Sequence, residues 1–408
     1  MNYDLAIIGG GPAGLMAALR ASAAGKKVIL LEKNPRLGLK LLTTGGGRCN
    51  LTNNIPNYRV LAASYGQNGK FLLSAFSRFG VLETMAFFEE HGVKLKTEST
   101  NKVFPVSDLA TDVLGVFVCG IENNGGLIKT KSEVREIILK KDKIEKIILT
   151  TGEEIKADNF LIATGGLSYP GTGSSGAGYQ WLKKLAHTIT PLSPALTPIL
   201  VREKFIADLE GLSWAEAAVS LLEKNKKIAR ELGPLMFTAT GLSGPAVLNL
   251  SRLFDYHQAQ NFSLELDFYP SKTLVDLEKE VLALISGNNK LIRNCLVELA
   301  PERLAAAWLS FAQVNPEKMA NALSRQERQA LVQAMKSLRL EIKSVEGFDR
   351  AMVTRGGLDL KEVDPKTMRS KLVPNLLVAG EILDLVGPTG GYNLQLCWST
   401  GWVAGGLS

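Results

Sequence analysis

The first 32 residues of the chain show the clearest pattern of apolar and polar positions. Asp4–Ile8 is a short apolar run typical of a buried strand, and a cluster of glycines follows it. Pro12–Ala24 is rich in Ala and Leu and predicts a helix, and Lys27–Leu31 predicts a second strand. The pattern therefore indicates a strand–helix–strand unit of the kind that builds parallel sheets.

Further strands are predicted in the middle and near the end of the chain. Alternating apolar residues between positions 129 and 160 favour a β-meander. Two apolar runs, Phe160–Gly166 and Leu376–Glu381, read as strands that end in small residues or an acid. We therefore expect one α/β sheet that is built from both ends of the chain. The helices expected beside it are Gly69–His91 and a final helix that opens at Gly390 and runs towards Ala404.

The middle of the chain has a different character. Glycines, prolines and strand-like pieces dominate from about Thr190 to Pro270, whereas residues 272–338 carry Leu and Ala at helical spacing. This change predicts an insertion between the two halves of the α/β domain. The expected domains are an α/β domain of residues 1–189 and 345–408, a β-rich, barrel-like domain of 190–271 and about 336–344, and a small helical domain of 272–335.

Glycines at three fixed positions give the first candidate site. Gly9, Gly11 and Gly14 form GxGxxG between the first strand and the helix, and Glu32 ends the second strand. In such a turn the first glycine permits the tight bend, the second lets the backbone approach a pyrophosphate, and the third allows the helix to pack on the strand. The helix N-terminus then faces the phosphates, and the acid accepts hydrogen bonds from a ribose. This combination predicts a dinucleotide site.

Composition and cysteine usage limit the remaining possibilities. The 408 residues are 46% hydrophobic and 21% charged, an ordinary globular composition for two or three domains. The four cysteines show no CxxC pair, so neither a zinc site nor a disulfide framework is indicated and we expect no metal. The N-terminus has no basic region before its short apolar run, and no run reaches about 18 apolar residues. We expect a soluble, cytoplasmic protein without a membrane segment.

Positive charge is concentrated early in the chain, although the net charge is only +7. Between positions 20 and 78 there are ten basic residues and one acid, Glu32. This excess is either solvated surface with counter-charge for one phosphorylated cofactor, or a landing surface for a polyanion. The basic residues are Arg20, Lys26, Lys27, Lys33, Arg36, Lys40, Arg48, Arg59, Lys70 and Arg78.

Three motifs together carry a family resemblance. They are GGGPAGLMAA with its following acid, LLTTGGGRCNLTN, and VAGEILDLVGPTGGYNLQ. The sequence resembles, over essentially its whole length, the BaiN / RdsA / aminoacetone-oxidase-like family of FAD flavoproteins. The resemblance implies a glutathione-reductase-like FAD-binding Rossmann domain and an oxidoreductase that uses NAD(P)H to reduce conjugated double bonds. The YPGTGSSGAGYQ loop lacks a second strand ending in an acid, so we expect no separate NAD(P)H domain.

The TTGGGRCN loop is expected to face the flavin. Its three glycines allow the main chain to pass flat against the ring and to offer N–H donors. Arg48 either holds an FAD phosphate or a substrate oxyanion, or it braces the loop. Cys49 either donates the proton that reduction of a C=C bond requires, since a thiol near pKa 8.5 is a possible acid, or it packs as a small buried sulfur.

The last motif supplies the other side of the expected cofactor site. Gly380 and Glu381 are expected near the diphosphate and ribityl chain, and the helix that starts after Gly391 is expected to direct its positive end at the flavin, which stabilises the reduced, anionic ring. The residues expected to contact FAD are Gly9, Gly11, Pro12, Ala13, Gly14, Glu32, Lys33, Lys40, Thr44, Gly45, Gly46, Gly47, Arg48, Asn50, Ala163, Thr164, Gly165, Gly380, Glu381, Gly390, Gly391, Tyr392 and Asn393, with Cys49 as the candidate catalytic residue.

The family's assigned activities differ, so the substrate stays open at this point. We favour a uridine in ribosomal RNA, reduced as by a dihydrouridine synthase, because the basic segment surrounds the cofactor motifs. The alternatives are a small-molecule enone reductase of the bile-acid type, an amine oxidase, and a non-catalytic RNA-binding factor that contains FAD. NAD(P)H is the expected electron donor, and ribosomal RNA is the expected macromolecular partner.

Overall fold

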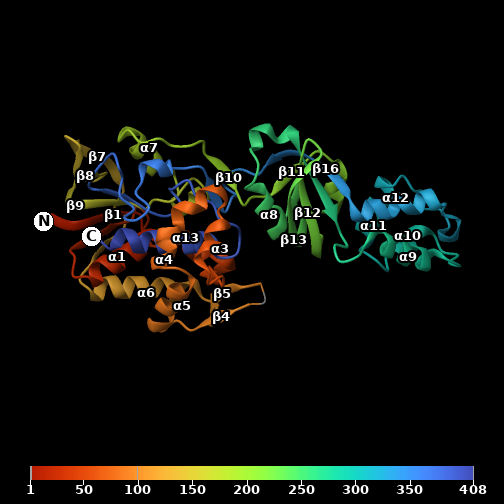
Figure 1. Ribbon diagram of the computed structural model, residues 1–408, viewed down its shortest axis with the longest axis horizontal. Coiled ribbons are helices and arrows are strands. Elements are labelled where there is room, and N and C mark those ends of the chain that lie inside the picture. Colours follow the sequence, from red (N-terminus) through yellow and green to blue (C-terminus); the bar gives the residue numbers. More distant parts are fainter. Residues whose placement is uncertain (1, 99, 408) are drawn as a thin grey trace. The chain divides into compact units, whose positions relative to one another are not determined.

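A computed structural model describes residues 2–98 and 100–407 of the chain. The chain folds into two compact units (Figure 1). The first unit holds the chain up to Ala195 and again from Phe348 onward, and the second unit holds Leu196–Gly347. Both ends of the chain therefore build the first unit, and the second unit is inserted between them. The domain boundaries expected inside the insertion stay a prediction.

The first unit is built on a seven-stranded sheet in the order β6-β2-β1-β9-β8-β7, with β18 also paired to β9. β6, β2, β1, β9 and β18 run parallel, whereas β7, β8 and β9 form the expected antiparallel meander. Residues 5–8 of β1 are almost fully buried, as the apolar run of a parallel strand covered on both faces requires. The strands are β1 (Asn2–Ile8), β2 (Val28–Leu31), β6 (Leu127–Lys129), β7 (Val134–Lys140), β8 (Lys143–Leu149), β9 (Glu154–Ile162) and β18 (Leu376–Val378).

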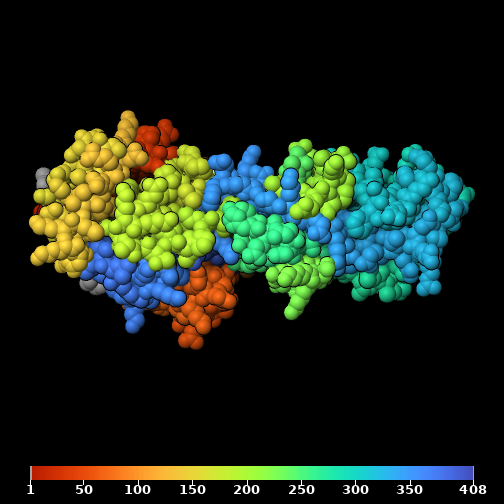
Figure 2. Space-filling view, turned by 90° about the horizontal axis from the view of Figure 1, so that it is seen from above, coloured from red at the N-terminus to blue at the C-terminus, as the bar shows by residue number. Residues whose placement is uncertain are grey.

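The first and last helices of the chain, α1 (Pro12–Ala23) and α13 (Tyr392–Gly405), pack against each other (Figure 1). A Cβ atom on Gly401 would lie 2.4 Å from the carbonyl oxygen of Ala13, so the two backbones meet because this position has no side chain. Figure 2 shows the blue C-terminal segment among gold and orange segments of the first unit. The other helices of this unit are α2 (Leu39–Thr43), α3 (Tyr58–Ala63), α4 (Leu73–Arg78), α5 (Val81–Glu90), α6 (Ala110–Asn123) and α7 (Ala177–Lys184).

The helical stretch expected from Gly69 to His91 is interrupted. A 3₁₀ segment and α4 end before Gly80, whose backbone is extended and whose N–H donates to Glu83 Oε2 (2.9 Å), so α5 starts as a separate helix. Two small sheets complete the unit. They are β3 (Thr52–Asn53), β5 (Lys102–Pro105) and β4 (Leu95–Thr97) in the order β3-β5-β4, and β10 (Ser193–Ala195) with β17 (Val353–Arg355).

The second unit contains a closed six-stranded barrel in the order β11-β14-β13-β12-β15-β16. The chain leaves the barrel after β15, forms four α-helices and returns through β16. The barrel interior and these helices share one hydrophobic core. The elements are β11 (Ile199–Val201), β12 (Ser213–Glu223), β13 (Lys226–Thr238), β14 (Gly241–Ser243), α8 (Pro245–Ser251), β15 (Phe262–Asp267), α9 (Leu274–Ile285), α10 (Ile292–Leu296), α11 (Glu302–Phe311), α12 (Arg325–Lys336) and β16 (Leu338–Val345).

Membrane-spanning potential is limited to one composite segment. Across residues 2–98 and 100–407, no single helix has the length and hydropathy to cross a bilayer, but Gly66–Arg78 and Val81–Glu90, bent by 41°, pass that test as a pair.

Candidate functional site

The turn between β1 and α1 is shaped by three glycines with different surroundings. A Cβ on Gly9 (φ +111°) would lie 2.5 Å from the carbonyl oxygen of Ala163, and one on Gly14 would lie 2.0 Å from that of Gly9. The protein's own backbone therefore excludes side chains at both positions. Gly11 is different, because its Cβ position has no atom within 4 Å. The turn thus leaves one open face, directly before the N-terminus of α1, where an anion would meet unpaired N–H groups.

Glu32 lies beside this turn and is 8% exposed. Its Oε2 accepts from Gly10 N (2.8 Å), and its Oε1 accepts from the backbone and side-chain nitrogens of Asn34 (2.8 Å each). A carboxylate has about four acceptor positions, so about one stays available for a ribose hydroxyl. Lys33 Nζ donates to Ser175 Oγ (3.0 Å), which connects this region to the loop after β9.

The carboxyl ends of the parallel strands meet at one edge of the sheet. Ala163 follows β9 and donates its N–H to Ile8 O (2.9 Å), while Gly380 follows β18 and would place a Cβ 2.8 Å from that of Ala13. Thr164 Oγ1 is buried without a hydrogen-bond partner among the described residues, and Gly165 has φ +69°. Ligands of doubly wound sheets bind outside this edge. The residues of these two strand ends that are expected to contact FAD therefore lie where such a ligand would bind.

Lys40 and Glu381 form an ion pair that the sequence did not indicate. Lys40 Nζ lies 2.7 Å from Glu381 Oε2 and 2.7 Å from Ser168 Oγ, and the two charged side chains are 22% and 13% exposed. Glu381 Oε1 also accepts from Ser168 Oγ (2.7 Å) and Thr354 N (2.9 Å). These contacts hold together four segments that are distant in the sequence. A cofactor that contacts Lys40 or Glu381 would therefore meet side chains that are already ion-paired.

The glycine-rich loop has the backbone that its sequence suggests. Gly45, Gly46 and Gly47 have φ values of +58°, +70° and +90°, a left-handed region in which glycine avoids the penalty of a Cβ. Gly45 and Gly46 are exposed, and the Cβ position of Gly46 is open. Thr44 holds the base of the loop, because its carbonyl oxygen accepts from Cys49 N (3.0 Å). An exposed main-chain surface is thus available to a flat ligand.

Arg48 has partners within the protein. Its Nη1 donates to Glu98 Oε1 (2.8 Å) and lies 3.4 Å from Asp108 Oδ1, and its guanidinium stacks 3.9 Å from the ring of Phe104. The carboxylate of Glu98 raises the pKa of the guanidinium, chiefly through this hydrogen bond. These contacts correspond to the loop-bracing alternative, and a contact of Arg48 with FAD or substrate stays a prediction.

The side chain of Cys49 is buried and does not reach the surface of the glycine-rich loop. It is 0% exposed and belongs to the core of the first unit, and it takes the unusual φ of +62° for a non-glycine residue. Burial raises the pKa of its thiol to about 12, with a smaller opposing effect from a hydrogen bond with Thr44. Both observations favour the packing alternative that the sequence left open. The catalytic role stays a prediction, and no proton transfer is assigned to this residue below.

The glycine-rich loop and the start of α13 are held against each other. With the Asn50 amide oriented to suit its neighbours, its oxygen accepts from Gly391 N (3.2 Å), and Asn53 Nδ2 donates to Gly390 O (3.1 Å). A Cβ on Gly391 would lie 2.4 Å from Thr52 O, which explains this glycine. The second and third sequence motifs therefore form one structure.

Internal hydrogen bonds hold the two residues that follow Gly391. The Asn393 amide is used within its own loop, because Oδ1 accepts from Gly387 N (2.9 Å) and Nδ2 donates to Gly387 O (3.0 Å) and Pro388 O (3.1 Å). Asn393 therefore fixes its own loop, and its contact with the cofactor stays a prediction. The carbonyl oxygen of Tyr392 accepts from Tyr65 Oη (2.7 Å).

A buried polar network supports this contact and was missed in the sequence. Gln395 is 0% exposed, accepts from Thr52 Oγ1 (2.6 Å), and donates to Thr84 Oγ1 (2.8 Å) and Ser399 Oγ (2.9 Å). It therefore joins β3, α5 and α13. The signal in the sequence was weak, because Gln395 and Ser399 lie in a helix that also carries Asn393 and Thr400 among its apolar residues, YNLQLCWSTGW.

The basic segment of positions 20–78 does not form one uniform surface. The guanidinium of Arg20 lies 4.3 Å from the ring centre of Trp402, and Lys40 and Arg48 are engaged as described above. Arg36 and Arg59 are exposed. Part of the charge excess is therefore used within the fold, which weakens the case for a single landing surface there.

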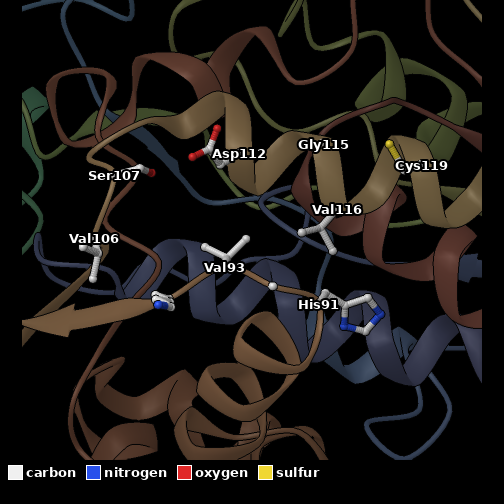
Figure 3. A pocket seen from close by; sticks show the side chains of 10 residues that line it. His91, Val93, Val106, Ser107, Asp112, Gly115, Val116 and Cys119 are labelled. Carbon is white, nitrogen blue, oxygen red and sulfur yellow. The ribbon is translucent and has the colours of Figure 1, made fainter.

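A separate open groove of about 620 Å³ lies between the end of α5 and α6 (Figure 3). His91, Val93, Asp112 and Cys119 are among the side chains that line it, and none of the expected site residues does. In the part of the chain that the structure describes, no group of three or more His, Cys, Asp or Glu side chains is placed to hold a metal ion.

Residues 3–407 match the family described as HI0933-like protein Rossmann domain. A ribosomal RNA dihydrouridine synthase of Escherichia coli (strain K12) is 31% identical over 402 residues, which cover 98% of this chain and 96% of the relative. A 3-dehydro-bile acid delta(4,6)-reductase of Clostridium scindens is 31% identical over 413 residues and 98% of both chains. The fold resembles a 3-ketosteroid delta1-dehydrogenase from Sterolibacterium denitrificans, with a TM-score of 0.55, 10% identity, and coverage of 99% and 98%.

Proposed function

The chain belongs to the HI0933-like family of FAD-dependent Rossmann oxidoreductases, and we propose that it reduces the C5–C6 double bond of a uridine in ribosomal RNA. The observation that carries the proposal is the full-length likeness to a ribosomal RNA dihydrouridine synthase. We also propose NAD(P)H as its electron donor and the cytoplasm as its location.

The residues around the βαβ turn fit FAD. The open Cβ face of Gly11 gives a diphosphate room to approach, whereas Gly9 and Gly14 are needed by the protein's own backbone. The first turn of α1 would hold the phosphates through its N–H groups and its positive end. The remaining acceptor position of Glu32 would bind the ribose.

When bound and reduced by NAD(P)H, FAD would supply a hydride to one carbon of an electron-poor C=C bond, and the other carbon would take up a proton. The chain's part is to orient the ring and to stabilise negative charge on it. The exposed backbone of Gly45 and Gly46 suits the first task, and the N-terminus of α13 beside Asn50 suits the second, because its positive end is fixed before reaction.

A small-molecule enone reductase is the second candidate. The bile-acid reductase and the RNA-modifying relative are both 31% identical to this chain, and both matches cover 98% of it. A uracil ring and a steroid enone both carry a C=C bond conjugated to a carbonyl, so the same cofactor arrangement would serve either. Family likeness alone therefore does not separate them.

Anaerobic reduction followed by reoxidation separates these functions. The FAD-loaded protein is mixed with NADH or NADPH, and bleaching of the flavin is followed. Ribosomal RNA from cells that lack the gene, or a steroid 4-en-3-one, is then added. The proposal expects recovery of flavin colour and dihydrouridine formation with RNA. Recovery with the steroid alone would support the second candidate. Oxygen consumption with aminoacetone and no NAD(P)H would indicate an amine oxidase, and no flavin turnover with any donor would indicate a non-catalytic role.

A further inference from the structure

We propose that the outer face of the barrel in the second unit binds the phosphate backbone of RNA. This rests on the proposed function and adds to it a surface that the sequence did not indicate. The face is formed by β13, β12, β15 and β16, which are neighbours in that order. Four strands at about 4.8 Å spacing span roughly 14 Å, so cations on β13 and β16 can meet separate phosphates.

The strand register places charged residues in one row across this face. Ser220 of β12 pairs with Arg230 of β13 and with Glu265 of β15, and Glu265 pairs with Arg339 of β16. Directly opposed residues of antiparallel strands point to the same side. Leu264 lies in the barrel core, so its neighbour Glu265, and with it the whole row, faces outward.

Two half-buried carboxylates each hold two cations. Glu265 Oε1 lies 2.7 Å from Lys227 Nζ, and Glu265 Oε2 lies 3.5 Å from Arg339 Nε. Asp267 Oδ2 lies 2.8 Å from Lys336 Nζ and 3.8 Å from Arg230 Nη2. The side chains of the acids are 12% and 17% exposed, whereas those of Lys227, Arg230 and Arg339 are 57%, 51% and 50% exposed. The charge of these two carboxylates is therefore largely covered, whereas three of the four cations that they hold face solvent.

This arrangement suits a polyanion. Each carboxylate leaves one positive charge uncompensated, and the ion pairs restrict long side chains before a ligand arrives, which lowers the entropy lost on binding. Arginine also matches phosphate with a planar fork of donors. The ion-pair cluster carries two more cations than anions; the cations are Lys227, Arg230, Lys336 and Arg339, and the anions are Glu265 and Asp267.

The test uses a double variant, Lys227→Gln with Arg230→Gln. Glu265 keeps Arg339 and Asp267 keeps Lys336, so neither carboxylate loses all its partners and the barrel is expected to fold. The matched control, Arg36→Gln with Arg59→Gln, also removes two positive charges, but from exposed positions of the basic segment in the first unit. FAD content and NAD(P)H oxidation should be unchanged in both.

Binding of a ribosomal RNA fragment is measured between 50 and 200 mM salt. The barrel variant should bind about tenfold more weakly at 50 mM, and the slope of log affinity against log salt should fall by about 1.4 to 1.8, since each lost phosphate contact removes about 0.7 to 0.9. A charge-keeping variant, Lys227→Arg with Arg230→Lys, should retain the slope. The control should match the wild type.

Three results would overturn the surface: a larger loss in the control than in the barrel variant, equal losses in both, or unchanged RNA binding with an altered oligomeric mass, which would make the face an interface between copies. Failure of the proposed function is read separately, from dihydrouridine formation. If the wild-type protein forms no dihydrouridine but the barrel variant still loses RNA binding, the proposed RNA-binding surface stands and the proposed substrate does not.

Discussion

Replacing Gly11 with valine should separate cofactor binding from folding. Gly11 has φ −85° and ψ −177°, an extended conformation that valine adopts readily. No atom lies within 4 Å of its Cβ position, so the Cβ of the new side chain meets none of the described residues. The new side chain would instead occupy the space that a diphosphate needs. Folding without FAD should therefore survive, and binding of FAD should not.

The two effects should have opposite signs. Without FAD, loss of glycine's freedom in the unfolded chain is expected to leave stability unchanged or higher by about 0.4–1 kcal/mol. At FAD concentrations 100 times the dissociation constant, the wild type should gain about 2.7 kcal/mol, whereas the variant should gain almost nothing. At saturating FAD the variant is therefore expected to be the less stable protein by roughly 2 kcal/mol.

Urea unfolding with and without FAD, together with a flavin fluorescence titration, measures both quantities. Gly115→Val is the matched control, because Gly115 lies within α6 and its Cβ position is also open. The control should keep the gain with FAD. Wild-type FAD affinity in Gly11→Val would refute the assignment of this turn to the phosphates. A loss of stability without FAD would show that the turn needs this glycine for its own packing.

Three further predictions concern the supporting residues. Because Cys49 is fully buried in the core, Cys49→Ala should keep turnover within about threefold, whereas a catalytic acid at this position, the alternative that stays open, would make the loss 10²- to 10⁴-fold; steady-state NAD(P)H oxidation with substrate distinguishes these outcomes. Burial raises the pKa of the Cys49 thiol from 9.0 to about 12, so the stability that the neutral thiol contributes is fully present below pH 9. As the pH rises from 9 towards 12, the free energy of unfolding should fall by up to about 1.4 kcal/mol per pH unit. Urea unfolding at pH 8 and pH 10 should therefore show a smaller drop in the free energy of unfolding for Cys49→Ala than for the wild type. Gln395→Leu should cost about 1–3 kcal/mol, because Thr52 and Thr84 lose buried partners, and should speed amide exchange in residues 44–53; unchanged exchange there would remove Gln395 as the residue that positions the loop.

The fold class was predictable because its signals are local and periodic. The βαβ unit, the meander and the final helix each appear as uninterrupted runs, and the α/β fold with an inserted barrel is confirmed. The family and the FAD cofactor are confirmed as well. The break before α5 was missed, since Gly80 interrupts the helical period by only one residue and its extended backbone is set by a hydrogen bond with Glu83.

The site was predictable only as a set of residue types. Glycine often marks a position where a side chain would collide or where the backbone is unusual, so the packing roles of Gly9 and Gly14 were predictable from their spacing. Pairing between distant residues has no such signal, and the Lys40–Glu381 ion pair joins positions that are 341 residues apart. For the same reason, counting charges along the chain could not show which basic side chains are engaged within the fold. The contacts of the expected residues with FAD stay predictions.

The most direct test of the proposed function is the dihydrouridine content of ribosomal RNA, measured by mass spectrometry of nucleosides in cells with and without the gene. The proposal expects dihydrouridine to disappear from a specific ribosomal RNA fragment when the gene is deleted. A plasmid copy should restore it, and a copy that carries Gly11→Val should not. Identical dihydrouridine levels with and without the gene, in cells where no other enzyme makes this modification, would contradict the proposal and favour the reduction of a small-molecule enone.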